Sequence, residues 1–219
     1  MAKRFIVIGL GNFGSGVAET LHTLNNEVVA LDVHEDAVDR IAAHVTRAAV
    51  GDGRDAQVLE RIGARDADGG IISTGDDITA SVLSTLALRD VGVKEIYVKV
   101  ISHEHARVME KLGVTETVFP ERDSARRLGH RISSRTLLNY IELGTDFGMQ
   151  EMAVPDAWVG KTLRQLQLPR KFGVSVIAVH DVLTDEMKPV PDPDAVLKES
   201  DTLLVAGTTK NLARCAKLG

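Results

Sequence analysis

The chain has 219 residues, of which 44% are hydrophobic and 26% charged, and its formal net charge at pH 7 is -5. These proportions are typical of a globular protein, and the acidic balance argues against nucleic acid as the main partner, because phosphate binding requires a basic surface. A single cysteine, Cys215, excludes an intramolecular disulfide and a cysteine-built metal cluster. No apolar stretch approaches the roughly 20 residues of a membrane-spanning helix, so we expect a cytosolic globular protein.

The first 120 residues alternate between predicted strands and predicted helices. Short apolar runs predict strands at 4–10, 27–33, 46–50, 70–74, 95–100 and 114–119. Segments with a helical period lie between them, at 11–25, 35–43, 55–62, 78–91 and 103–112. Such alternation is typical of βαβ units, which form a parallel sheet with helices on both faces. The sequence therefore predicts a doubly wound α/β domain over residues 1–120.

The pattern changes after Pro120. Residues 121–143 read as one long helical stretch, with Ser133 and Ser134 as the place where it would break. Beyond it the sequence predicts strands at 149–154, 174–180 and 202–206, short helices at 162–167 and 210–217, and a turn-rich segment at 181–196. We therefore expect a small α+β lobe over residues 144–219, joined to the first domain by the helical region 121–143.

A glycine-rich turn carries the strongest functional signal. Residues 9–14 fit the pattern G-x-G-x-x-G, follow a predicted buried strand and open a helix, and Asp32 closes the second strand. Gly9 permits a tight turn, Gly11 lets a phosphate approach the backbone, and Gly14 lets the helix pack against the strand. Free N–H groups of Asn12 and Phe13 at the helix start would face the anion, and Asp32 would accept hydrogen bonds from a ribose. The sequence therefore predicts a bound adenine nucleotide.

Further candidates follow the other strands, because a doubly wound sheet holds its ligand beyond the carboxyl ends of its strands. Val33 follows Asp32 directly, and the remaining candidates are Asp52 after the third strand, Thr74 and Gly75 after the fourth, and Lys99 near the end of the fifth. Lys99 would either face a phosphate or reach solvent. Asp52 would either touch the ligand or hold its own loop by side-chain hydrogen bonds.

Five sequence blocks resemble the cytosolic regulatory subunits of Ktr/Trk potassium-uptake systems, in which an RCK (TrkA-N) domain precedes a TrkA-C lobe. The blocks are residues 5–14 (FIVIGLGNFG), 29–32 (VALD), 50–52 (VGD), 97–100 (YVKV) and 119–123 (FPERD). The resemblance covers essentially the whole chain. It implies a Rossmann-like domain, a crossover helix within 121–143 and a TrkA-C lobe over the remainder.

The resemblance also implies a function. In this family the protomers pair through the crossover region and assemble from dimers into an octameric ring beneath a membrane-embedded potassium channel. ATP and ADP favour different ring shapes, NAD(H) also binds in the family, and the subunit catalyses nothing. Glu121 matches an acidic residue that helps to hold a divalent cation, Mg²⁺ or Ca²⁺, beside the phosphates; alternatively, it is an ordinary acidic partner of a helix start. The implied location is the cytoplasmic face of the cell membrane.

Two departures from the family bear on the ligand. Asn12 stands where close Ktr relatives commonly have an arginine that reaches the terminal phosphate, which leaves room for ADP, AMP or NAD(H). The segment 168–174 resembles one that precedes a strand in relatives binding cyclic di-AMP. Pro169 stands where those relatives have an arginine, one position before Arg170, so cyclic di-AMP is the weaker expectation.

Two other classes of protein share the predicted fold. A small NAD-dependent oxidoreductase would use Asp32 to select NAD over NADP, but no motif places a catalytic set in the second lobe. A redox-sensing repressor would need a DNA-binding segment, and the acidic balance opposes it.

Overall fold

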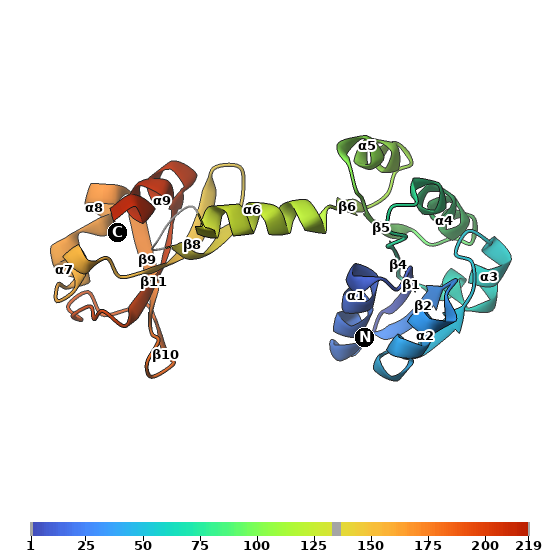
Figure 1. Cartoon of the computed structure of the whole chain (residues 1–219), viewed down its shortest axis with the longest axis horizontal. Helices are drawn as coiled ribbons and strands as arrows, with labels where there is room; N and C mark the ends of the chain where they lie inside the picture. The colour runs from blue at the N-terminus through green and yellow to red at the C-terminus, as the bar shows by residue number, and fades with distance from the viewer. Residues whose placement is uncertain (1, 133–136, 219) are drawn as a thin grey trace. The chain divides into compact units, whose positions relative to one another are not determined.

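The computed structural model describes residues 2–132 and 137–218, and the chain divides after Glu121 into two compact units, each with its own sheet (Figure 1). No helix within these described residues is long and apolar enough to cross a membrane.

The first unit is built on a six-stranded parallel sheet with the order β3-β2-β1-β4-β5-β6. Its strands are β1 (Arg4–Ile8), β2 (Glu27–Asp32), β3 (Arg47–Val50), β4 (Gly69–Ile72), β5 (Glu95–Lys99) and β6 (Glu116–Val118). The helices between them are α1 (Asn12–Thr23), α2 (Glu35–Ile41), α3 (Ala56–Arg61), α4 (Ile78–Asp90) and α5 (His103–Lys111). This topology confirms the predicted doubly wound, Rossmann-like fold.

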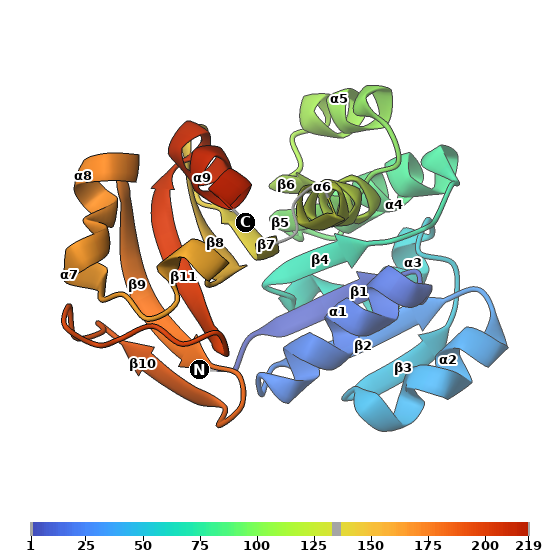
Figure 2. The ribbon, with the colours of Figure 1, turned by 60° about the vertical axis from the view of Figure 1, so that its left-hand side comes forward.

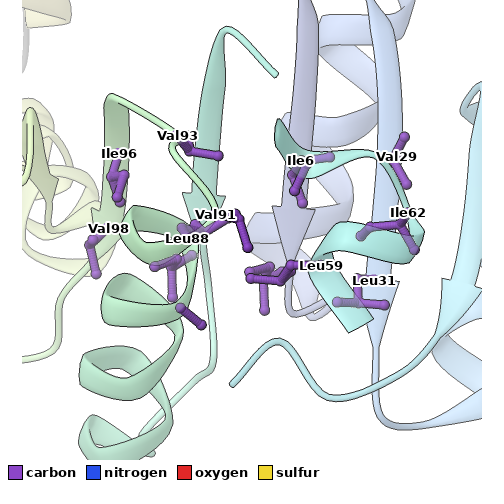
Figure 3. Packing of buried hydrophobic residues seen from close by; sticks show 14 of the residues in the cluster. Ile6, Val29, Leu31, Leu59, Ile62, Leu88, Val91, Val93, Ile96 and Val98 are labelled. Carbon is purple, nitrogen blue, oxygen red and sulfur yellow. The ribbon is translucent and has the colours of Figure 1, made fainter. Parts of the chain in front are cut away.

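Alternating side chains of the central strand face two separate cores. Val7 packs with residues of α1 and α2 on one face of the sheet. Ile6 and Ile8 pack on the other face with residues of α3, α4 and α5, where Figure 3 shows Leu59 beside Ile6 and Leu31. Because both faces are covered, residues 5–8 of β1 are all apolar, as expected for a strand buried on two sides, whereas Arg4 at its start is only partly buried.

The order of the strands reverses at β1, which lies between β2 and β4. The residues that follow β4 and β1 hydrogen-bond to the ends of neighbouring strands at this point. The Ser73 amide donates to the Ile8 carbonyl of β1 at 2.7 Å, and the Gly9 amide donates to the Leu31 carbonyl of β2 at 2.9 Å. Such a reversal at the carboxyl ends of the strands is where doubly wound folds bind ligands.

The second unit contains a five-stranded antiparallel sheet with the order β10-β9-β11-β8-β7 (Figure 2). The strands are β7 (Leu137–Glu142), β8 (Phe147–Ala153), β9 (Val174–Asp181), β10 (Glu186–Pro189) and β11 (Asp201–Thr208). The helices are α7 (Leu163–Leu166), α8 (Leu168–Phe172) and α9 (Thr209–Cys215). Met152, Leu203 and Leu212 lie in its core, which is separate from both cores of the first unit.

The connection between the sheets is helix α6 (Pro120–Ile132). Short 3-10 helices complete the two units: η1 (Ala42–His44), η2 (Ala64–Asp66), η3 (Asp156–Trp158) and η4 (Ala216–Leu218).

The structure corrects three expectations in the second half of the chain. The predicted long helix 121–143 ends at Ile132, and Leu137–Glu142 is strand β7, paired antiparallel with β8. Its expected break at Ser133 and Ser134 lies outside the described residues. The turn-rich segment contains β10, which pairs with the edge of β9, and a helix that was not predicted, α8, follows α7.

Candidate functional site

The first glycine of the turn has a backbone conformation that only glycine adopts easily. Gly9 has a φ of +90°. A Cβ atom at this position would lie 2.2 Å from the Ser73 carbonyl oxygen, which follows β4. Glycine is therefore required here for the close approach of the two loops.

The second and third glycines have different surroundings. A Cβ at Gly14 would lie 1.9 Å from the Gly9 carbonyl oxygen, so this glycine lets α1 start directly against the turn. A Cβ at Gly11 would meet nothing within 4 Å. Gly11 is the N-cap of α1 and has no side-chain capping bond. The amides of the first turn of α1 therefore border open space, which is the arrangement that binds anions at helix starts.

Asp32 ties the glycine turn to the end of β2. Its side chain is 11% exposed. Oδ2 accepts a hydrogen bond from the Leu10 amide at 2.6 Å, and Oδ1 accepts from the His34 amide at 2.9 Å and lies 3.0 Å from His34 Nδ1. Burial acts to raise the pKa of this carboxyl, but the Leu10 and His34 donors outweigh it, so the pKa lies below its ordinary value. Asp32 is thus held ionised at the edge of the turn.

A pocket of about 230 Å³ opens beside Gly11 and Asn12. Ser15 and Glu19 of α1 line it on one side, and Arg40 of α2 lines it on the other. The motif did not predict Arg40, because no spacing rule connects the glycine turn to the sixth residue of α2.

The loop after β3 is closed by an ion pair. Arg54 Nη2 donates to Asp52 Oδ2 at 2.7 Å, and the Arg54 amide and Nε each donate to Oδ1 at 2.9 Å. The Arg54 side chain and amide hold the pKa of Asp52 below its ordinary value, against the opposing effect of burial. Asp52 therefore holds its own loop, which is one of the two roles expected for it. Val33, at the end of the neighbouring strand, is 54% exposed.

The loop after β4 borders the same edge of the sheet. Thr74 Oγ1 donates to the Asp77 carbonyl at 3.2 Å, and Asp77 caps α4 through its side chain. Gly75 has a φ of +65° and open space where a Cβ would lie. The structure thus brings Thr74 and Gly75 to the loop that meets the glycine turn through Ser73 and Gly9.

Phe13 and Lys99 line a second pocket, of about 330 Å³, rather than the one beside Asn12. Phe5, Tyr97 and Val118 supply much of its remaining surface, which makes it mainly apolar. The pocket lies against the face of the sheet beside α1. Of the predicted binding residues, Gly11 and Asn12 therefore line one pocket of the first unit, and Phe13 and Lys99 line another.

Lys99 and Glu121 form an ion pair at the start of α6. Lys99 Nζ lies 2.6 Å from Glu121 Oε1, and the two side chains are 14% and 61% exposed. The Lys99 ammonium, followed by the Glu121 amide, lowers the pKa of the Glu121 carboxyl. Glu121, the predicted cation ligand, therefore has a positively charged partner in this structure, and its own carboxylate stays accessible to solvent.

The segment of the second unit that resembles cyclic di-AMP binders forms α8 and the start of β9. Pro169 lies in the first turn of α8, Leu168 is buried, and Arg170 is exposed. Gly173 ends the helix with a φ of +69°.

Comparison with known proteins identifies the domain families to which the two parts of the chain are similar. The TrkA-N domain family matches residues 5–120, and the TrkA-C domain family matches residues 149–218. Ktr system potassium uptake protein C of Bacillus subtilis is 36% identical over 99% of this chain and 97% of its own length. Ktr system potassium uptake protein A of Vibrio alginolyticus is 33% identical over 98% and 97% of the two chains.

Solved structures show the same fold. The GsuK channel matches all of this chain with a TM-score of 0.70 and 21% identity, and this chain spans 39% of that channel's length. The AMP-bound Kef CTD of Shewanella denitrificans matches 57% of this chain and 77% of its own length, with a TM-score of 0.51 and 27% identity. The family matches and the 33–36% identity to Ktr proteins over nearly the full length are consistent with the glycine turn and the two-unit architecture. The chain therefore belongs to the TrkA-N/TrkA-C family, which includes the Ktr potassium-uptake proteins.

Proposed function

We propose that this protein is the nucleotide-binding regulatory subunit of a Ktr/Trk-type potassium-uptake system, and that it gates a membrane-embedded potassium channel or transporter without catalysing a reaction. The observation that carries the proposal is the match to Ktr uptake proteins over 97–99% of this chain, joined to a glycine turn with open space at the start of α1. The subunit would act in the cytoplasm, bound peripherally to the inner face of the membrane.

The nucleotide would bind along the carboxyl edge of the first sheet. Its ribose would hydrogen-bond Asp32, whose Oδ1 now faces the exposed His34 side chain and whose Oδ2 holds the Leu10 amide. A ribose hydroxyl can replace the His34 side chain on Oδ1 without disturbing the turn, because the Leu10 bond uses the other oxygen. The phosphates would then lie against Gly11 and the first amides of α1. The AMP-bound Kef relative supports an adenine nucleotide, whether ATP, ADP or the adenosine half of NAD(H).

A divalent cation would bind at Glu121. Mg²⁺ is commonly held in proteins by one or two carboxylates together with substrate phosphates, and the half-exposed Glu121 carboxylate fits that requirement. When bound, the cation would neutralise phosphate charge. Lys99 would have to release Glu121, so the ammonium competes with the cation for the same carboxylate.

Gating requires that the nucleotide bind one assembly better than another. A ligand shifts a conformational equilibrium only by its difference in affinity for the two states. We propose that the protein forms dimers that assemble into an octameric ring, and that ATP and ADP favour different ring shapes. Glu121 begins the connection to the second unit, so a cation at this residue would join ligand occupancy to α6.

Native mass spectrometry of the purified protein, with and without ATP, ADP and NADH in the presence of Mg²⁺, tests the proposal. An octamer that carries adenine nucleotide, together with nucleotide-dependent potassium flux when its membrane partner is reconstituted in vesicles, is the expected result. A monomer or simple dimer that binds only NAD(H) would overturn it. Normal nucleotide- and cation-dependent flux with Glu121→Gln would remove Glu121 from the mechanism.

A further inference from the structure

The pocket between α1 and α2 begins at the end of the glycine turn, beside the N-terminus of α1. Leu10, Gly11 and Asn12 form one end of it, and the remaining lining residues come from the next turns of α1 and from the end of α2. Its volume of about 230 Å³ lies below the roughly 300 Å³ found for pockets that take a complete small ligand. The space therefore suits part of a nucleotide that is seated on the turn.

The pocket is lined by one positively charged and one negatively charged side chain, and only the positive one can attract a phosphate. Among its lining residues, Arg40 is the cation and Glu19 is the anion. Both side chains are exposed, and within the described residues Arg40 forms no ion pair with an acidic group. Asn12, at the mouth of the pocket, is uncharged. A phosphate that enters from the turn would thus meet one guanidinium, on α2.

We propose that Arg40 binds the outermost phosphates of the nucleotide and makes the site prefer ligands with more phosphate groups. The inference rests on the proposed nucleotide site. A guanidinium presents several N–H donors in a planar fork that matches two phosphate oxygens, and such charge-assisted bonds are stronger than neutral ones. The amides at the start of α1 bind the first phosphates, and Arg40 supplies the positive charge that Asn12 does not.

The Glu19 carboxylate can compete with a phosphate for the Arg40 guanidinium. In the absence of nucleotide, the flexible Arg40 side chain can approach this carboxylate, and a phosphate then has to draw it away. Removing the Glu19 charge should therefore strengthen binding of ATP. If Arg40 serves only to pair with Glu19 and to hold α1 against α2, removing either charge should have the same effect.

The experiment is a titration of the full-length protein with AMP, ADP and ATP by isothermal calorimetry, without divalent cation. Five proteins are compared: the wild type, Arg40→Ala, Arg40→Lys, Glu19→Gln, and the control Arg61→Ala, which removes an exposed arginine from α3 away from this pocket. For Arg40→Ala we expect the affinity for ATP to fall about 10- to 100-fold, as for loss of a hydrogen bond to a charged group, and the affinity for AMP to fall less than about threefold. Arg61→Ala should match the wild type, and Glu19→Gln should bind ATP at least as tightly.

The outcomes separate this inference from the proposed function. If the wild type binds nucleotides and Arg40→Ala weakens AMP and ATP equally, or not at all, Arg40 is not a phosphate ligand, while the nucleotide site stands. Equal losses for Arg40→Ala and Glu19→Gln would assign the pair a packing role and overturn the inference. A wild type that binds no adenine nucleotide would overturn both. Arg40→Lys, which keeps the charge without the fork, should recover part of the preference for ATP.

Discussion

Replacing Gly11 by alanine separates the binding role of the glycine-rich turn from its folding role. Gly11 has a φ of -68° and a ψ of -175°, which alanine adopts without strain, and a Cβ there would meet nothing within 4 Å. The added methyl group would therefore leave the free protein intact. It would project from the backbone that we propose a phosphate must approach closely.

The expected magnitudes follow from this geometry. Gly→Ala at a compatible φ stabilises by about 0.4–1 kcal/mol through the unfolded chain, whereas alanine is a poorer N-cap than glycine by a similar amount, so the two effects nearly cancel. We expect Gly11→Ala to change the free energy of unfolding by less than about 1 kcal/mol. Loss of one charge-assisted contact between a helix amide and phosphate should lower ATP affinity about tenfold or more.

Two other glycines of the same segment provide matched controls. Gly16 lies within α1 and also has open space at its Cβ position, so Gly16→Ala should stabilise the helix by up to about 1 kcal/mol and leave ATP affinity unchanged. Gly14→Ala would place a Cβ 1.9 Å from the Gly9 carbonyl oxygen. Because backbone has to move, it should destabilise the protein by about 3 kcal/mol or more, at the upper end of the overpacking range.

Urea unfolding and calorimetric titration of the three variants check this prediction. Wild-type ATP affinity in Gly11→Ala, with an intact fold, would refute the reasoning that Gly11 is the point of phosphate approach. A loss of ATP affinity in Gly16→Ala equal to that in Gly11→Ala would show that the effect comes from α1 as a whole.

Three further predictions concern the ionised and buried groups. Because the pKa of Asp32 is lowered in the folded state, its charge stabilises the fold above the ordinary pKa of 3.8, and this contribution disappears as the pH falls through the folded-state pKa. The free energies of urea unfolding of the wild type and Asp32→Asn should therefore converge at acidic pH, and a difference that stays constant with pH would contradict the prediction. Leu59→Ala and Leu203→Ala each empty a fully buried position, in the first and the second unit, and each should cost about 2–5 kcal/mol in thermal or urea unfolding; a cost below about 1 kcal/mol would show a loosely packed core. Lys99→Met removes the partner of Glu121, so it should change the free energy of unfolding by less than about 1 kcal/mol and tighten Mg²⁺ binding in the presence of ATP. Calorimetry measures the Mg²⁺ affinity, and Glu121→Gln should abolish Mg²⁺ binding. Weaker Mg²⁺ binding in Lys99→Met would show that the ammonium does not compete.

The alternation of strands and helices in the first unit was predictable because each element carries its own signal. A strand buried on two faces is apolar, as in residues 5–8, and the helices that follow show a helical period. The glycine turn was equally local: its glycines and its helix start belong to one short segment. These features depend on neighbours along the chain, so the sequence displays them directly.

Strand β7 illustrates what local patterns leave undecided. Leu137, Leu138 and Ile141 have a spacing that suits one face of a helix as well as a strand, and helix α6 extends to Ile132. Pairing with β8 makes the segment a strand, and that choice depends on hydrogen bonds to another segment. The same holds for β10, which is exposed along its length and ends in Pro189, so that its pairing with the edge of β9 defines it.

In the candidate site too, some features were predictable from sequence and others depend on the tertiary structure. The sequence by itself predicted the doubly wound domain, the glycine-rich turn at Gly9–Gly14 and the position of Asp32 at the end of β2, because each of these has a signal in neighbouring residues. Only the tertiary structure decided that Arg40 shares a pocket with Asn12 and that Lys99 pairs with Glu121. These residues lie on elements that are distant in sequence, and the order of the strands in the sheet, which no single strand specifies, brings those elements together.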